Sequence, residues 1–184
     1  MKKFYTIILL STLLIACQPP VDNSAKEAFE RNSKTVQAYI DGFEAESIDY
    51  EKIYSKNLVV MRGTSFGSND STGLPEMMSN DKKGWAKFDF ELVNKPAILL
   101  PGVNADTKEL DGSVRYYGTW RVTLPATDST EEKSGVIKLY ESFDFDEEGK
   151  IVYQQYYGDG SGLFMYLNGL DMYAKVAPAD QNNE

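Results

Sequence analysis

Apolar residues recur at two different spacings along the chain. From Ser24 to Phe43 they fall three or four positions apart, which places their side chains on one face of a helix. Ser24 followed by Glu27 is the pattern of a capping box, in which each side chain satisfies a free amide at the helix start. Further helices are expected at 47–55 and 74–85.

Apolar and polar residues alternate in most of the second half, which is typical of strands with one buried face. Strands are expected at 57–63, 87–93, 97–102, 112–125, 136–146 and 150–158. The last two flank "EEG" at 147–149, a strong hairpin signal. A closing helix is expected over 160–176.

Helices, then long antiparallel strands, then a helix is an α+β order. Glycines at 112, 118 and 158 lie within or beside the long strands and favour strong curvature. The predicted fold is a curved, mostly antiparallel sheet wrapped around the N-terminal helix, with one open end. Residues 24–175 are expected to form one domain, and 176–184 a disordered tail.

The first residues have the pattern of a secretory signal peptide. Lys2 and Lys3 precede an apolar run of about a dozen residues, shorter than the roughly 20 that a transmembrane helix needs. "LIAC" at 14–17 resembles a bacterial lipobox, which implies acylation of Cys17 and removal of 1–16 as the signal peptide. Residues 17–23 would be a tether. The alternatives are a buried thiol in a core helix or a single membrane-spanning anchor.

The composition excludes several classes of partner and of catalytic site. The 184 residues carry a net charge of −9, one cysteine and no histidine. An acidic chain without a basic run argues against a nucleic-acid partner. The absence of histidine excludes His-dependent triads and most zinc sites, so no metal and no cofactor is expected. Acid–base chemistry would have to use carboxylates, tyrosines or lysines.

Two stretches carry a family resemblance. "NSKTVQAYIDGFEAESIDYEKIYSKNLVV" at 32–60 and "FDFDEEGKIVYQQYYGDGSGLFMYLNG" at 143–169 resemble the nuclear transport factor 2-like superfamily, in its SnoaL-like branch. The resemblance covers most of residues 23–173. It implies a cone-shaped fold around a pocket, shared by isomerases, dehydratases, cyclases and pure binding modules.

The same resemblance implies the role of Asp159, whereas the tyrosine and tryptophan candidates follow from the residues themselves. Asp159 matches the position of an aspartate that handles a proton in the cyclases, whereas the histidine that those enzymes carry five residues earlier falls on Gln154, which cannot take up a proton. Tyr116 and Tyr140 are the candidate hydrogen-bond donors beside Asp159. The candidate ligand-binding residues are Trp120, Gln154, Tyr156 and Trp85. The alternatives are a loop acid at a helix start for Asp159 and plain packing for the aromatic residues.

Two main hypotheses for function follow. The first is a lipid-anchored protein of the bacterial cell envelope, facing the periplasm or on the outer membrane, whose domain binds a small, partly apolar molecule or a protein partner. The alternative is an acid–base isomerase, dehydratase or cyclase, which requires a buried Asp159 with a raised pKa. A homodimer formed through the strand face at 115–123 is a third possibility.

Overall fold

The structure is a computed structural model that describes residues 22–62 and 71–170. Its helices are α2 (Ser24–Glu44), α3 (Tyr50–Ile53), α4 (Leu74–Trp85) and α5 (Ser161–Leu167). Cys17, the predicted signal peptide and the predicted tail lie outside the described residues. No helix within the described residues is both long enough and apolar enough to span a bilayer.

Within residues 22–62 and 71–170, seven strands form one sheet. They are β1 (Tyr54–Arg62), β2 (Ser71–Thr72), β3 (Asp89–Leu92), β4 (Ile98–Val103), β5 (Leu110–Leu124), β6 (Lys133–Phe145) and β7 (Ile151–Tyr157). The order is β2-β1-β7-β6-β5-β3, with β4 also paired to β5. Only the β1–β7 pair is parallel among these strands. The predicted α+β class and mostly antiparallel sheet are confirmed.

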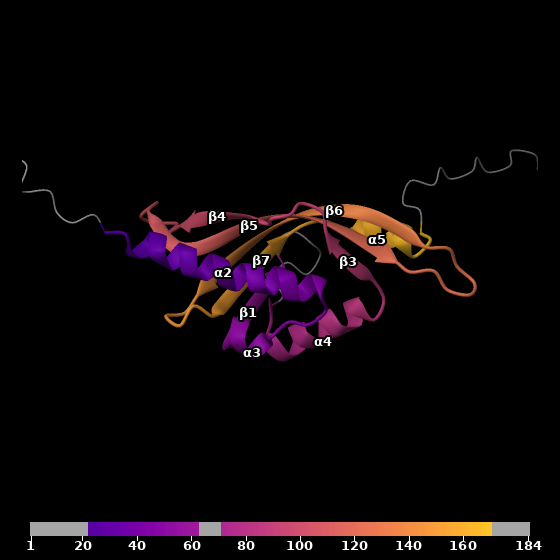
Figure 1. The fold of residues 1–184 in the computed structure, drawn as a ribbon, viewed down its shortest axis with the longest axis horizontal. Helices are drawn as coiled ribbons and strands as arrows, with labels where there is room; N and C mark the ends of the chain where they lie inside the picture. The colour runs from indigo at the N-terminus through magenta and orange to yellow at the C-terminus, as the bar shows by residue number, and fades with distance from the viewer. Residues whose placement is uncertain (1–21, 63–70, 171–184) are drawn as a thin grey trace, which may run out of the picture.

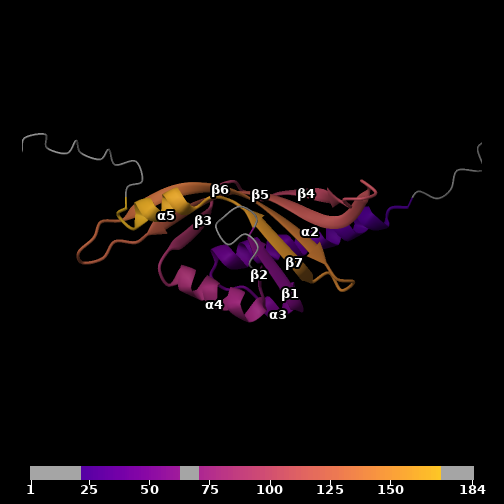
Figure 2. The same ribbon diagram turned by 180° about the vertical axis from the view of Figure 1, so that it is seen from behind.

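The sheet is curved and open, and α2 lies along its concave side (Figure 1). Helices α3 and α4 lie on the same side, beyond the C-terminal half of α2. Seen from behind, α5 lies at the end of the sheet opposite to the start of α2 (Figure 2). The predicted arrangement of a sheet wrapped around the N-terminal helix is therefore confirmed.

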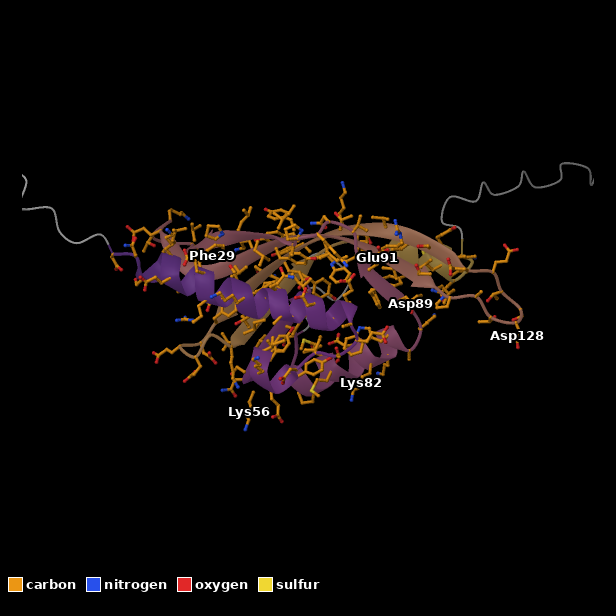
Figure 3. All side chains as sticks on the ribbon, in the orientation of Figure 1. Phe29, Lys56, Lys82, Asp89, Glu91 and Asp128 are labelled. Atoms are coloured by element: carbon orange, nitrogen blue, oxygen red, sulfur yellow. The ribbon has the colours of Figure 1, made fainter. Side chains whose placement is uncertain are left out.

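The core lies between α2 and the concave face of the sheet. Val36 and Ile40 of α2 are fully buried against strand residues such as Val114 and Phe143, which are also fully buried. Burying each of these side chains contributes about 1.5–3 kcal/mol. Figure 3 shows side chains filling the space between helix and sheet, with Phe29 near the N-terminal end of α2.

A bend in β5 lets α2 approach the sheet closely. Gly112 has a φ of +79°, and an added Cβ there would lie 2.7 Å from the Ala28 side chain. Only glycine adopts this left-handed conformation without strain. The buried Asn32 donates a 2.9 Å hydrogen bond from Nδ2 to the Gly112 carbonyl, so the helix is tied to the bend by a polar contact as well as by packing.

Three local predictions differ from the structure. The capping box is wrong, because Asn23 is the N-cap of α2 and makes no side-chain capping bond. The helix predicted at 47–55 is only Tyr50–Ile53, since Asp49 caps its start and Tyr54 is already extended in β1. The closing helix ends at Leu167.

Candidate functional site

A cavity of about 400 Å³ lies between α2, the inner sheet face and α5; we call it the inner cavity. Its lining residues are Tyr39, Phe43, Phe90, Trp120, Val122, Ile137, Leu139, Glu141, Tyr156, Gly158, Gly160, Ser161 and Phe164. Apolar and aromatic side chains dominate this wall, as in most sites for small molecules.

Glu141 is the one carboxylate among these lining residues. It lies on the inner face of β6 and is only 5% exposed. Burial raises the pKa of Glu141 to about 7; the hydrogen bond from Gln154 opposes this shift, and the negative charge of Asp81 adds to it. At neutral pH the carboxyl therefore exists in both its protonated and its ionised form.

A hydrogen-bonded chain holds Glu141 in place. Gln154 Nε2 donates to Glu141 Oε2 at 2.7 Å and to the Tyr39 hydroxyl oxygen at 3.3 Å. On its other side, Gln154 Oε1 accepts a 3.1 Å bond from the Tyr54 hydroxyl. These contacts use both ends of the amide, whereas Oε1 of Glu141 has no hydrogen-bond partner among the described residues.

Strand alternation explains why these groups meet. Leu139, Glu141 and Phe143 follow every second position of β6 and share its inner face. Glu141 is paired with Tyr156 in the neighbouring β7. Gln154, two positions before Tyr156, lies on the same face and reaches Glu141 diagonally.

A second cavity, of about 350 Å³, is partly formed by α4; we call it the side cavity. Its lining residues are Val60, Ser71, Thr72, Glu76, Met77, Asn80, Asp81 and Tyr156. Tyr156 lines both cavities. Burial raises the pKa of Asp81 to about 6, and a 2.9 Å hydrogen bond from the Tyr50 hydroxyl to Asp81 Oδ2 opposes that shift.

Three of the predicted ligand-binding residues lie at the inner cavity or next to it. Trp120 and Tyr156 line it. Gln154 is 4% exposed and contacts it through Glu141. Trp85 is not among the lining residues; its ring packs against Phe43 with centroids 5.6 Å apart.

The expectation of a buried Asp159 with a raised pKa is wrong. Asp159 is exposed, although its neighbours Gly158 and Gly160 line the cavity. Hydrogen bonding to Ser161 lowers the pKa of Asp159, and its Oδ1 accepts a 2.9 Å bond from the Ser161 amide. This local bond, which turns the carboxylate back onto the start of α5, keeps it out of the cavity.

The two candidate donor tyrosines lie elsewhere. Tyr116 is fully buried in the core and does not line the inner cavity. Tyr140 belongs to the outer face of the sheet, where its ring lies 5.1 Å from that of Tyr117 and 5.8 Å from that of Tyr157, centroid to centroid. Neither phenol is placed to work with Asp159.

Sequence reasoning missed Glu141, although "IKLYESF" contained a signal for it. Ile137, Leu139 and Phe143 predict an apolar strand face, and Glu141 is the charged residue on that face. Burying a charged side chain in an apolar row is costly unless its surroundings offer hydrogen bonds or an opposite charge. A carboxylate at such a position therefore indicates a functional residue.

The residues at the cavities do not resemble a metal centre. Across 22–62 and 71–170, no three His, Cys, Asp or Glu side chains are grouped so that they could hold a metal ion. Glu141 and Asp81 instead lie in separate cavities. Proton transfer and hydrogen bonding are the chemistry that these groups offer.

The sequence matches no family model and no curated protein. Among solved structures, the fold is similar to that of a candidate polyketide cyclase from Xanthomonas campestris pv. campestris, with 15% identity, a TM-score of 0.56, and coverage of 77% of this chain and 97% of that chain. A candidate SnoaL-like polyketide cyclase from Shewanella denitrificans OS-217 has 15% identity and a TM-score of 0.51, over 75% and 97% of the two chains.

A nuclear transport factor 2-like protein from Anabaena variabilis ATCC 29413 has 9% identity and a TM-score of 0.54, over 78% of this chain and 98% of that chain. Likeness at such low identity concerns the fold alone. The fold is similar to that of these proteins, in agreement with the fold that the sequence resemblance implied.

Proposed function

We propose that the domain binds a small, mostly apolar molecule in the inner cavity and hydrogen-bonds one polar group of that molecule through Glu141. The observation that carries this proposal is the position of Glu141, a buried carboxyl in an apolar wall that has one oxygen without a hydrogen-bond partner among the described residues. Burial of apolar surface supplies most of the affinity at such sites, and a few polar groups fix the orientation of the ligand.

A fluorescence titration tests this proposal. N-phenyl-1-naphthylamine is an uncharged apolar probe whose emission rises in a dry site. Ile137 lines the cavity, whereas its neighbour Val136 is 53% exposed on the opposite face of the same strand. Binding by the purified protein that is lost in Ile137→Trp and kept in Val136→Trp supports the proposal; equal binding by the two variants contradicts it.

Acid–base catalysis is the second candidate function, with Glu141 in the role first expected of Asp159. The observation in its favour is the burial of Glu141 in the wall of the inner cavity. This burial raises the pKa of Glu141 to about 7, and a general acid or base works best with a pKa near the working pH. Isomerases, dehydratases and cyclases all need such a proton carrier.

Proton exchange would reveal this activity. The protein is incubated in D2O with 2-decalone, an apolar ketone, and NMR follows the loss of the protons next to the carbonyl. Catalysed exchange that is abolished in Glu141→Gln and kept in Asp159→Asn supports acid–base function. Exchange at the uncatalysed rate in the unaltered protein argues for binding alone.

We also propose, from the sequence, that Cys17 is acylated and anchors the protein in the bacterial envelope. Two or three acyl chains give essentially permanent membrane attachment. Labelled palmitate should enter the unaltered protein and not Cys17→Ala; labelling of both would contradict the anchor.

The homodimer is likewise a proposal from the sequence. The row of Tyr117, Tyr140 and Tyr157 on the outer face is a surface through which two copies could pair. Light scattering on the Cys17→Ala protein should give twice the monomer mass. Adding Tyr140→Asp to this protein should reduce the measured mass to that of the monomer. A monomer in the first measurement would contradict pairing.

A further inference from the structure

Gln154 fixes the direction of the hydrogen bonds at the wall of the inner cavity. An ionised carboxylate such as that of Glu141 can only accept hydrogen bonds, so the 2.7 Å contact requires the amide nitrogen of Gln154 to face Glu141. The amide oxygen then faces Tyr54, whose hydroxyl donates to it at 3.1 Å. Both contacts agree with one orientation of the amide.

This orientation leaves Tyr39 as a hydrogen-bond donor. The amide nitrogen of Gln154 carries two hydrogens; one goes to Glu141 and the other to the Tyr39 hydroxyl oxygen, at 3.3 Å. Tyr39 is thus an acceptor toward Gln154, and its own O–H has no acceptor among the described residues. Burial raises the pKa of Tyr39 well above its usual value, and the negative charge of Glu141 adds to this shift. The phenol therefore stays protonated, and its hydrogen is left to donate.

The ring of Tyr39 is held by aromatic neighbours on several sides. Its centroid lies 5.7 Å from that of Phe143, 6.1 Å from that of Tyr54 and 6.2 Å from that of Phe43. Such edge and tilted contacts favour one placement of the ring. A donor that is already positioned loses little conformational freedom when it bonds to a ligand.

Tyr39 and Glu141 form one polar spot in the largely apolar wall. Both side chains line the inner cavity and both bond to the same nitrogen, so one small group is enough to bond to both. At pH 8, where Glu141 is mainly ionised, that group meets a donor on Tyr39 and an acceptor on Glu141. A hydroxyl is the smallest group that both accepts and donates, whereas a carbonyl or ether oxygen only accepts and an ammonium only donates.

We propose that the ligand of the inner cavity is an apolar alcohol, whose hydroxyl accepts a hydrogen bond from Tyr39 and donates one to Glu141. This inference rests on the proposed function and names the chemical class of the ligand. The amide of Gln154 determines this preference, because it fixes which of the two side chains donates and which accepts.

Competition between an alcohol and a ketone of the same skeleton tests the inference. Trans-2-decalol and trans-2-decalone are uncharged, and each is titrated at pH 8 against bound N-phenyl-1-naphthylamine. Both oxygens can accept from Tyr39, but only the alcohol can donate to Glu141. We expect decalol to displace the probe at about one tenth of the concentration that decalone needs, because a hydrogen bond to a charged group contributes about that factor.

Glu141→Gln replaces an acceptor by an amide that can also donate to a ketone. We expect this variant to bind decalol and decalone about equally. The ratio of the two competitors is compared within one variant, so a changed affinity for the probe does not affect it. In the matched control, Glu91→Gln on β3, the substituted residue is exposed and does not line the cavity (Figure 3). This control should keep the preference for the alcohol.

Tyr39→Phe removes the hydroxyl and keeps the ring. Since both compounds accept from Tyr39, both should need about fivefold higher concentrations, the factor expected for one neutral hydrogen bond. The preference for decalol should remain, because Glu141 is unchanged. Tyr166→Phe is the control, since Tyr166 is 53% exposed on α5 and does not line the cavity. It should leave both affinities unchanged.

A pH series on the unaltered protein gives a readout that does not depend on a folded variant. Below about pH 7 Glu141 takes up a proton and can donate to a ketone, so the preference for decalol should decline from pH 8 to pH 5. The other titratable groups around Glu141 are Tyr39 of α2, Tyr54 of β1, Asp81 of α4, Tyr116 of β5 and Tyr156 of β7.

Of these groups, Tyr39, Tyr54 and Tyr116 have pKa values that burial raises, so they stay protonated throughout the series. Asp81, with a pKa of about 6, titrates in the same range. The decline should therefore also be measured in Asp81→Asn, where we expect it to persist. A decline that disappears in Asp81→Asn would assign it to Asp81 and count against the inference.

The outcomes separate the two proposals. Failure of the inner cavity to bind N-phenyl-1-naphthylamine at all would count against the proposed function itself. Normal probe binding with equal displacement by decalol and decalone at pH 8 would overturn only the alcohol inference. So would a preference for decalol that persists undiminished in Glu141→Gln, or affinities for both compounds that Tyr39→Phe leaves unchanged.

Discussion

Gln154 Nε2 donates a 2.7 Å hydrogen bond to Glu141 Oε2, across the pair of strands β6 and β7. Both side chains are almost fully buried, so each depends on the other for a polar contact that water would otherwise supply. Glu141 also lines the largely apolar inner cavity. The candidate function follows from this arrangement.

The buried Glu141 should make stability depend on pH. Its pKa is about 7 when folded against a reference value of 4.5, so the folded protein holds more protons than the unfolded chain between these two values. The free energy of unfolding therefore falls as the pH rises from about 4.5 to 7. Each unit of pKa difference corresponds to about 1.4 kcal/mol. Removal of this carboxyl should therefore make the decrease in the free energy of unfolding smaller by about 2–3 kcal/mol.

Denaturant unfolding of Glu141→Gln at pH 5 and pH 8 measures this difference. The control is Glu91→Gln, because Glu91 lies exposed on β3, where it forms an ion pair with Arg121 of β5. The control should retain the pH dependence of the unaltered protein. An unchanged dependence in Glu141→Gln would mean that its carboxyl is hydrated.

Removal of the amide should be more damaging than removal of the carboxyl. Gln154→Leu leaves Glu141, Tyr54 and Tyr39 without their shared partner. Unsatisfied buried polar groups cost about 1–3 kcal/mol each, and more where one is charged. We expect a loss of about 2–4 kcal/mol in the free energy of unfolding at pH 8, and a smaller loss at pH 5, where Glu141 is protonated.

Gln155→Leu is the matched control, because Gln155 lies on the outer face of the same strand and forms part of a surface hollow with Tyr140 and Tyr157. It should change stability by less than about 0.5 kcal/mol. Equal losses of unfolding free energy in the two variants would show that the hydrogen-bonded chain of Gln154 does not stabilise the fold.

Gly118 should be sensitive to the smallest substitution. A Cβ at Gly118 would lie 2.4 Å from the Tyr116 hydroxyl oxygen, and the Tyr116 side chain is fully buried. Gly118→Ala should lower the midpoint of thermal unfolding, with a cost of about 1–3 kcal/mol from overpacking. Gly162→Ala in α5, where nothing lies within 4 Å, should be neutral or slightly stabilising. Similar midpoints for the two variants would contradict this packing.

The sequence predicted the elements and the faces of the strands better than it predicted the site. A period of two places Trp120 on the same strand face as Val114 and Val122 whatever the tertiary fold, because each strand alternates. The same pattern cannot tell the concave face of one strand from the convex face of the next. Tyr140 therefore seemed equivalent to Tyr156, although the register of β6 and β7 puts them on opposite sides.

The prediction for Asp159 was wrong for a different physical reason. Asp159 lies in a short connection, where an aspartate readily bonds to a backbone amide two residues ahead, and its bond to Ser161 does so here. Burial raises the pKa of Glu141 and that of Asp81. This burial depends on contacts with residues distant in sequence. The Tyr50 that bonds to Asp81 is one such contact, 31 residues away.

The most direct test of the account is the titration of Glu141 itself. NMR of protein labelled with ¹³C at the glutamate side-chain carboxyls can follow it, with the signal assigned by its loss in Glu141→Gln. The account predicts a midpoint near pH 7, which moves higher when N-phenyl-1-naphthylamine fills the cavity, because further drying favours the protonated acid. A midpoint near 4.5 that the probe does not move would contradict it.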